Sequence, residues 1–247
     1  MSSLSVVMPA YNEEATLEKV VRLVLSVVPH LLELIIVNDG SRDRTAELAN
    51  GLAAADPRVR VIHQPRNMGK TQALITGFAA SRGEVVIVQD ADLEYDPAEI
   101  VEVIQPILDG KADVVYGSRF LVRKAARVLY FYHYLANKFL TFYSNLLTNI
   151  NLTDVETCYK AFRGEIIRNM IITSTGFGFE IEVTAKVAKL RCRIYEVPIS
   201  YYGRTYEEGK KIGMIDGIHA LWYILKYNAF CPLGKSFTRI PDLTQAK

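Results

Sequence analysis

The sequence predicts an α/β protein built on a Rossmann-like, mostly parallel sheet flanked by helices. Short apolar, β-branched runs alternate with helix-length segments through the first half of the chain, which is typical of right-handed βαβ units. These runs lack polar alternation, as expected of strands that are covered on both faces. With 247 residues, 50% of them hydrophobic, the chain is long enough to bury a sizeable core.

Strands are expected at residues 4–8, 34–37, 59–63, 85–88 and 113–116. Between them we expect helices, the first from about Glu13 with Asn12 as its N-cap, because an Asn side chain can accept a backbone hydrogen bond there. Later helices are expected from about Lys70 to Gly83 and from Pro97 to Leu108.

The strongest site signal follows the fourth strand, where Asp90 and Asp92 stand one residue apart. Side chains two positions apart on extended backbone point the same way, and open α/β sheets bind ligands beyond the carboxyl ends of their strands. Two carboxylates there suit Mg2+ or Mn2+, which also take phosphate oxygens from a substrate. One interpretation is therefore a metal-bound diphosphate. The alternative is that both aspartates only end the strand and cap the helix that Pro97 begins.

Other strand ends carry candidates with two interpretations. Asp39 can accept a hydrogen bond from a base or ribose, but Asp-Gly-Ser is also favourable turn chemistry. Gly69-Lys70-Thr71 resembles the end of a phosphate loop, yet Gln64 stands where that pattern requires Gly, which excludes a P-loop NTPase. Lys70 remains a candidate phosphate ligand at a helix start. Arg119 is either a phosphate clamp or a solvated arginine.

Composition narrows the class of protein. The net charge of +2 gives no indication of nucleic-acid binding. The three cysteines lack CxxC spacing, which favours a reducing compartment over a disulfide framework. No secretory signal opens the chain. The apolar runs from Val128 and Gly217 are interrupted by Lys138 and Lys226, short of the about 18 residues that a membrane span requires.

Five motifs occur in order: VVMPAYNEE from Val6, VNDGS from Val37, NMGK from Asn67, Asp90-Ala91-Asp92, and GSRF from Gly117. In this order they resemble the signatures of inverting family 2 glycosyltransferases with the GT-A fold. Within that family the chain resembles polyprenyl-phosphate sugar transferases of the dolichol-phosphate mannose synthase and bactoprenol glucosyltransferase type. The resemblance implies a glycosyltransferase domain over residues 1–228, followed by a tail over residues 229–247.

The resemblance also implies a nucleoside-diphosphate sugar donor, with a metal held on the diphosphate by Asp90 and Asp92. Glu94 is an implied third metal ligand, at a position where related synthases often have Gln. The residues implied to bind the nucleotide are Pro9, Tyr11, Glu13, Asp39, Lys70 and Asp90.

On the acceptor side, residues 153–163 are similar to a segment in which the residue at Asp154 has a catalytic or acceptor-positioning role. The segment GFGFEIE places Glu182 where family members have a glutamate facing the site. Arg204 and Lys210 have the spacing of a phosphate-binding loop, although a solvated basic turn is the alternative. The implied catalytic residues are Arg119, Asp154, Glu182, Arg204 and Lys210.

The function implied is inverting transfer of a hexose from GDP-mannose or UDP-glucose to a polyprenyl or dolichyl phosphate, giving a β-linked lipid-phosphate sugar. Two alternatives remain. One is a glycosyltransferase for a soluble or saccharide acceptor, although the Gln-x-x-Arg-Trp motif common in such enzymes is missing. The other is a nucleotide-sugar-binding protein without catalytic activity.

Apolar residues recur at steps of three and four from Val128 to Leu146, the period of an amphipathic helix, and tyrosines and cations accompany them. Aromatic side chains and basic flanks suit a membrane interface, so an interfacial helix is expected over residues 123–147. A core helix or a homodimer interface is the alternative. The chain is thus expected to be peripheral on the cytoplasmic face of the membrane, and the tail partly disordered.

In this interpretation three phenylalanines lie among acyl chains and four cations lie near lipid phosphates. The phenylalanines are Phe131, Phe139 and Phe142; the cations are Arg123, Lys124, Arg127 and Lys138.

Overall fold

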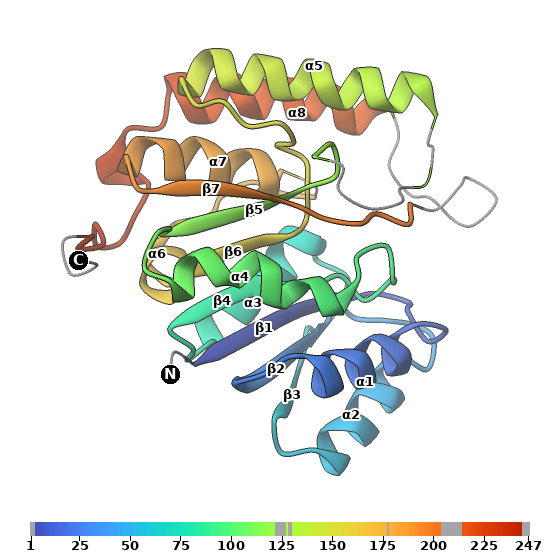
Figure 1. Ribbon diagram of the computed structural model, residues 1–247. Helices are drawn as coiled ribbons and strands as arrows, with labels where there is room; N and C mark the ends of the chain where they lie inside the picture. The colour runs from blue at the N-terminus through green and yellow to red at the C-terminus, as the bar shows by residue number, and fades with distance from the viewer. Residues whose placement is uncertain (1–2, 122–126, 128–129, 177, 204–213, 244–247) are drawn as a thin grey trace.

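The computed structural model describes residues 3–121, 127, 130–176, 178–203 and 214–243, and it has one seven-stranded sheet flanked by helices (Figure 1). The strand order is β3-β2-β1-β4-β6-β5-β7. The strands are β1 Leu4–Ala10, β2 Leu31–Asn38, β3 Val59–His63, β4 Val85–Val88, β5 Val114–Ser118, β6 Lys160–Arg163 and β7 Ile194–Pro198. The predicted α/β class and the five predicted strands are confirmed.

Strand β6 is antiparallel to both of its neighbours, β4 and β5, whereas the other pairings in the sheet are parallel. The prediction of a mostly parallel sheet is therefore confirmed. Because β6 runs the other way, its amino end lies at the sheet edge where the other strands have their carboxyl ends. The segment that enters β6 is thereby brought to the edge where ligands of such sheets bind.

Helices cover both faces of the sheet (Figure 1). Helices α1 Leu17–Val27 and α4 Ile100–Leu108 lie on one face, and α3 Lys70–Ala80 and α7 Phe179–Leu190 lie on the other. The strand β4 is buried along its whole length between these layers, which explains its unbroken apolar sequence. Shorter elements are α2 Thr45–Ala55, η1 Pro97–Glu99, α6 Gly164–Asn169 and η2 Leu233–Lys235.

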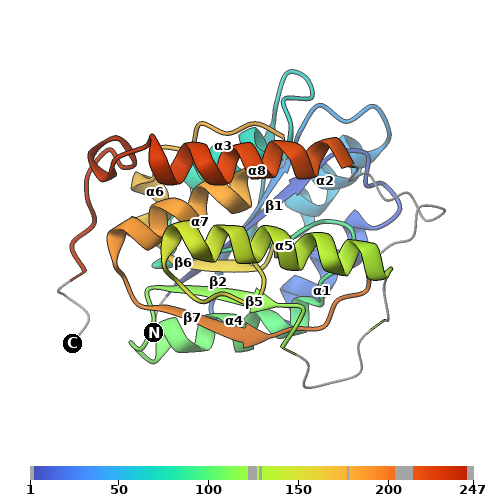
Figure 2. The ribbon, with the colours of Figure 1, turned by 90° about the horizontal axis from the view of Figure 1, so that it is seen from above.

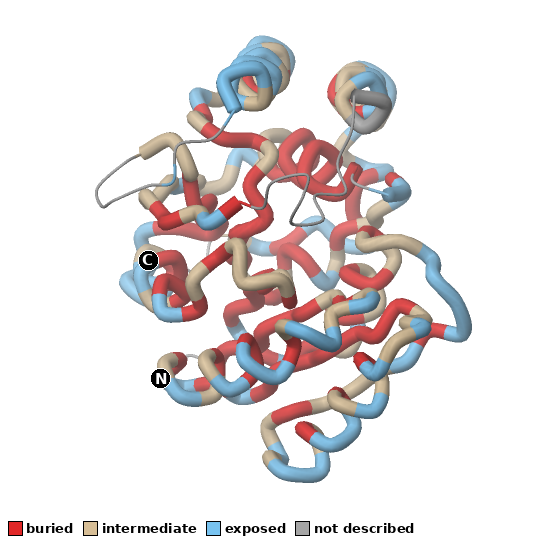
Figure 3. The backbone as a smooth tube through the Cα atoms, turned by 90° about the vertical axis from the view of Figure 1, so that its right-hand side faces the viewer, coloured by how far each residue is buried: buried red, intermediate tan, exposed pale blue. Residues whose placement is uncertain are grey.

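Two further helices, α5 Phe131–Thr148 and α8 Met214–Ala229, lie side by side above α7 (Figures 1 and 2). They are held to the protein by a small apolar cluster that includes Val155, Ile181 and Ile224. The outward turns of both helices are exposed at the top of Figure 3. No helix among the described residues is both long and apolar enough to cross a bilayer.

One local expectation is wrong. The first helix begins at Leu17 and Asn12 does not cap it: Asn12 has a left-handed φ of 54°, and its Oδ1 accepts the N–H of Arg42 at 2.9 Å. The side chain is thus used to join two loops. In the tail, the structure describes residues 229–243, with Phe237 buried and the Ile171 N–H donating to the Ser236 carbonyl at 2.9 Å, and the expectation of partial disorder stays a prediction.

Candidate active site

The first charged group of the site lies where β4 ends and α3 begins. The Lys70 ammonium is 3.0 Å from Asp90 Oδ1 and 3.6 Å from Glu180 Oε1, and it donates to Cys158 Sγ at 3.2 Å. Burial lowers the pKa of Lys70, but the attraction of Asp90 and its other neighbours outweighs burial and leaves the pKa well above its usual value. Lys70 is therefore a permanent cation at the sheet edge, and its expected role as a phosphate ligand stays a prediction.

The aspartates after β4 fit a divalent metal bound through a substrate. Asp90 already faces a cation, and Asp92 Oδ1 accepts the N–H of Glu94 at 3.1 Å, which fixes the direction of its carboxylate. Mg2+ and Mn2+ take such carboxylate oxygens together with phosphate oxygens and water. The helix cap in this loop is Asp96, which accepts the Ala98 N–H, so capping does not account for Asp90 or Asp92.

Glu94, the third expected metal ligand, hydrogen-bonds to the segment that follows β7. In the described part of the chain, no three His, Cys, Asp or Glu side chains gather into a group that could hold a metal ion. Glu94 Oε2 instead accepts the phenol hydroxyl of Tyr201 at 2.9 Å. The expected ligand set of Asp90, Asp92 and Glu94 therefore stays a prediction.

Asp39 holds the loop that leads to Lys70. Its two carboxylate oxygens accept the N–H groups of Met68 and Gly69, at 2.8 and 2.9 Å. Gly69 has a φ of +90°, a conformation that favours glycine. A carboxylate offers about four lone-pair sites, so these two bonds leave acceptor capacity for a ligand hydroxyl.

The other residues expected near the nucleoside lie at the end of β1. The Asp39 N–H donates to the Ala10 carbonyl at 2.9 Å, which joins this end to the end of β2. The three residues are half-buried: Pro9, Tyr11 and Glu13. The structure thus brings the predicted nucleoside contacts to one sheet edge, and nucleoside binding stays a prediction.

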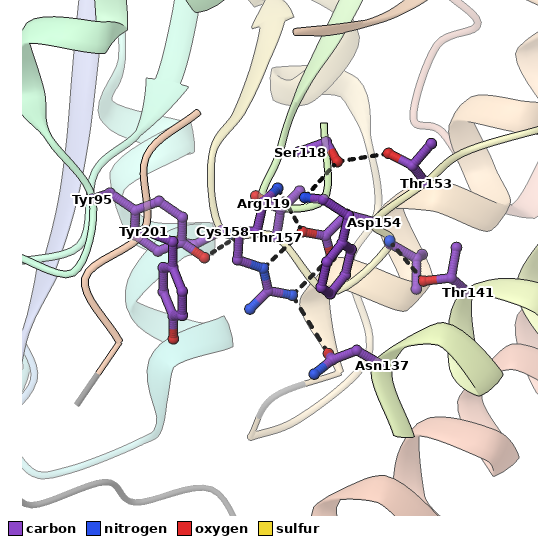
Figure 4. A network of polar contacts seen from close by, with 12 residues as sticks. Tyr95, Ser118, Arg119, Asn137, Thr141, Thr153, Asp154, Thr157, Cys158 and Tyr201 are labelled. Carbon is purple, nitrogen blue, oxygen red and sulfur yellow. Dashed lines mark hydrogen bonds and ion pairs between the residues drawn. The ribbon is translucent and has the colours of Figure 1, made fainter. Parts of the chain in front are cut away.

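The second charged group of the site is a buried ion pair after β5 (Figure 4). Arg119 donates from Nε and Nη2 to the two oxygens of Asp154, both at 2.7 Å, and its backbone N–H adds a third bond at 3.1 Å. The Arg119 side chain is 12% exposed and Asp154 is fully buried. Burial lowers the pKa of Arg119, but Asp154 more than offsets this and raises it above the usual value. Arg119 Nη1 makes no hydrogen bond to a described residue.

Aromatic rings connect the two charged groups. The Arg119 guanidinium lies 5.1 Å from the centre of the Tyr201 ring, and Tyr201 lies 5.3 Å from the Tyr95 ring. The Tyr95 hydroxyl accepts the N–H of Cys158, whose sulfur contacts Lys70. The Arg119–Asp154 pair and the Lys70–Asp90 pair therefore line one continuous site.

Helix α5 contributes to this site from above. Asn137 Oδ1 is 3.4 Å from Arg119 Nη2, and Lys138 Nζ lies 4.8 Å from the centre of the Phe120 ring and 3.4 Å from the Thr153 carbonyl. Lys138 therefore contacts the acceptor-side segment as well, and its expected position near lipid phosphates stays a prediction.

The expectation that Glu182 faces the site is also wrong. Glu182 is fully buried, accepts the N–H groups of Thr173 and Ser174, and pairs with Lys186 at 2.5 Å. These contacts give it a structural role. Its neighbour Glu180 faces Lys70 instead, because residues two apart on a helix point in nearly opposite directions.

Arg204 and Lys210 lie outside the described residues, so their phosphate-binding role stays a prediction. Sequence reasoning missed several residues of the site. Their motifs were recognised, but the direction of each side chain depends on the turn before β6 and on the phase of the helices. The missed residues are Tyr95, Asn137, Glu156, Cys158, Glu180 and Tyr201.

Comparisons with known proteins find a family and relatives that match most of the chain. The profile of the family described as "Glycosyl transferase family 2" matches residues 5–171. An undecaprenyl-phosphate mannosyltransferase of Micrococcus luteus is 31% identical over 85% of this chain and 88% of its own length. A polyprenol monophosphomannose synthase of Mycolicibacterium smegmatis is 31% identical over 84% of this chain and 80% of its own length.

Among solved structures, glucosyl-3-phosphoglycerate synthase of Mycobacterium tuberculosis has a similar fold. Its complex with Mn2+, UDP-glucose and phosphoglyceric acid superposes with a TM-score of 0.70 and 24% identity, covering 98% of this chain and 81% of that one. At this level of identity the likeness indicates the fold only.

Proposed function

The chain belongs to glycosyl transferase family 2, and from this premise we propose that it transfers a hexose from a nucleoside-diphosphate sugar to a polyprenyl phosphate. GDP-mannose and UDP-glucose are the two candidate donors. The observation that carries the proposal is the placement of two charged pairs, Lys70–Asp90 and Arg119–Asp154, in one site at the sheet edge. The first pair suits the donor diphosphate, and the second suits the acceptor phosphate.

On the donor side, Asp90 and Asp92 would hold Mg2+ or Mn2+, which stabilises charge on the departing nucleoside diphosphate when it is bound. Lys70 adds a buried positive charge beside it. Asp39 keeps the loop before Lys70 in place through two backbone bonds. The nucleoside contacts are assigned to Pro9, Tyr11, Glu13 and Asp39.

On the acceptor side, Arg119 would bind the phosphate of the lipid through Nη1 while Asp154 fixes its other two nitrogens. An acceptor phosphate is already an anion, so the site does not need a strong base to deprotonate it. Asp154 is accordingly a positioning residue for Arg119. Attack on the anomeric carbon from the face opposite the leaving group would invert its configuration, without a glycosyl-enzyme intermediate.

The test of the proposal is a donor panel followed by a transfer assay. We expect either GDP- or UDP-sugars, with Mn2+, to raise the melting temperature, because saturation to 100 Kd adds about 2.7 kcal/mol of stability. The donor that does so should yield a β-linked lipid-phosphate hexose. Product formed only with a soluble or saccharide acceptor would overturn the choice of acceptor, and donor binding without any turnover would point to a binding protein.

We propose further that α5 and α8 dock the enzyme on a cytoplasmic membrane surface, where a polyprenyl phosphate presents its headgroup. The α5 side chains Phe131, Phe139 and Phe142 are 67%, 56% and 65% exposed, and Trp222 of α8 is 55% exposed. Large exposed aromatics on adjacent helices are typical of an interfacial surface. Because Asn137, on the side of α5 away from Phe139, contacts Arg119, this surface lies next to the acceptor end of the site.

Replacing Phe131, Phe139 and Phe142 by Ser should sharply reduce flotation with anionic vesicles, because it removes three large exposed apolar side chains that can enter the headgroup layer. A Leu32→Ser, Leu108→Ser variant, which alters exposed leucines on other elements, should float like the wild type. Wild-type binding should also weaken with salt. Equal flotation of the wild type and the triple variant would assign the stripe to a homodimer interface. The same assignment would follow if neither protein floated with the vesicles and the wild type were a dimer in solution.

A further inference from the structure

Glu156 is a carboxylate inside the site. Among the described residues, no cation forms an ion pair with it. Its Oε1 is buried without a hydrogen bond to any described residue. Each neighbouring cation is paired elsewhere: Lys70 with Asp90 and Arg119 with Asp154. Glu156 as a whole is half-buried. Because one of its oxygens is buried without a partner, the surroundings favour the protonated acid over the ionised carboxylate.

Lys160, on β6, does not supply the missing partner. Its ammonium donates to the Val155 carbonyl at 3.0 Å and to the Thr157 carbonyl, which closes the turn before β6. Burial lowers the pKa of Lys160, which makes it a weaker cation. The turn thus places a lysine next to Glu156 but directs its hydrogen bonds to the backbone.

Glu180 adds a second carboxylate to the same space. It is 4% exposed and lies in the first turn of α7, with its Oε1 3.6 Å from the Lys70 ammonium. Burial, followed by repulsion from Glu180, raises the pKa of Glu156 to about 7; Lys160 and Arg119 act in the opposite direction and Asp154 adds to the rise. Two like charges in one closed site favour retention of a proton by one of them.

We propose that Glu156 is the proton-exchanging group of this site, exchanging a proton with solvent near neutral pH and keeping it when an anion binds beside Arg119. The second half of this statement rests on the proposed function, whereas the first half concerns the ligand-free protein alone. A bound phosphate brings negative charge next to Glu156, which favours the protonated acid. Ionisation of Glu156 above neutral pH should correspondingly weaken binding of an anionic acceptor. Glu156 is therefore a positioning residue that sets the charge of the site.

The first test measures the proton directly in the ligand-free protein. In 13C NMR spectra of protein labelled at the glutamate carboxyl carbons, the signal missing from a Glu156→Gln variant identifies Glu156. In the wild type, the chemical shift of this signal should titrate with a midpoint near pH 7. A Glu165→Gln variant, which removes a carboxylate paired with Arg163 at 2.7 Å outside the site, should leave that signal unchanged. A midpoint near the ordinary value of about 4.3 would overturn the proposal whatever the enzyme transfers.

Thermal stability provides a readout that requires no ligand. A carboxyl whose pKa is higher folded than unfolded binds more protons in the folded state, so its contribution to stability is lost as pH rises from about 4.3 toward 7. Glu156→Gln mimics the protonated acid and should therefore raise the melting temperature more at pH 8 than at pH 5. A gain that is equal at both values would contradict the proposal.

The second half is tested by calorimetry at pH 7.5 in two buffers of different ionisation enthalpy, with a soluble short-chain prenyl phosphate as the probe. The wild type should take up a fraction of a proton on binding and Glu156→Gln none. In assays of transfer, the wild-type KM for the acceptor should rise from pH 6.5 to 8.5 while that of the variant stays flat. Equal proton uptake by both proteins would overturn this half. If the probe bound neither protein, both the proposed retention of the Glu156 proton on anion binding and the proposed acceptor would be contradicted. The NMR titration of the ligand-free protein would still decide whether Glu156 exchanges its proton near neutral pH.

Discussion

Asp92→Asn is expected to abolish sugar transfer while leaving the protein folded. The change keeps the shape of the side chain but removes one of the two carboxylates that would hold the metal on the donor diphosphate. Stabilisation of charge on the leaving group is the largest contribution expected in such a site, where loss of a single contact costs roughly 100- to 1,000-fold in rate. Turnover with Mn2+ after chelator treatment measures the effect, and circular dichroism checks the fold.

Asp96→Asn is the matched control, because Asp96 is in the same loop and its side chain caps η1 through the Ala98 N–H. Asn is as good an N-cap as Asp, so turnover and stability should both stay close to wild type. If the Asp92→Asn variant kept wild-type turnover with and without added metal, the assignment of Asp92 to the metal would be wrong.

Asp154→Ala should lower the free energy of unfolding by about 3 to 5 kcal/mol, because it leaves the Arg119 guanidinium buried without its partner. Three hydrogen bonds from Arg119 to a fully buried carboxylate are lost at once. Urea unfolding of the purified variant measures this difference. Asp109→Ala, which breaks the exposed pair with Lys111, should have little effect on the same measurement.

A double-mutant comparison then separates the two roles considered for Asp154. If Asp154 acts by holding Arg119, Asp154→Asn should raise the KM for the lipid phosphate as Arg119→Gln does, and the double variant should be no worse than Arg119→Gln alone. If Asp154 is a base, the two losses in kcat should multiply instead. A multiplicative loss would therefore contradict the positioning role assigned here.

The fold could be predicted from the sequence because the relevant signals are local. Residues 85–88 are apolar and β-branched without alternation, and the structure buries that strand on both faces. The apolar stripe of residues 131–146 has helical period, and α5 is a helix with that stripe exposed. Asp90 and Asp92 were located by their position after a strand, because parallel strands direct their carboxyl ends to one edge.

What the sequence by itself determined was therefore which segments form the elements and which strand ends carry charge. Only the tertiary structure decided which side chains meet. The antiparallel insertion of β6 between β4 and β5 brings Asp154 and Glu156 to the site, although local patterning does not distinguish parallel from antiparallel pairing. The phase of α7 directs Glu180 toward Lys70 and Glu182 toward Lys186, and that rotation is set by packing against the sheet rather than by the two glutamates.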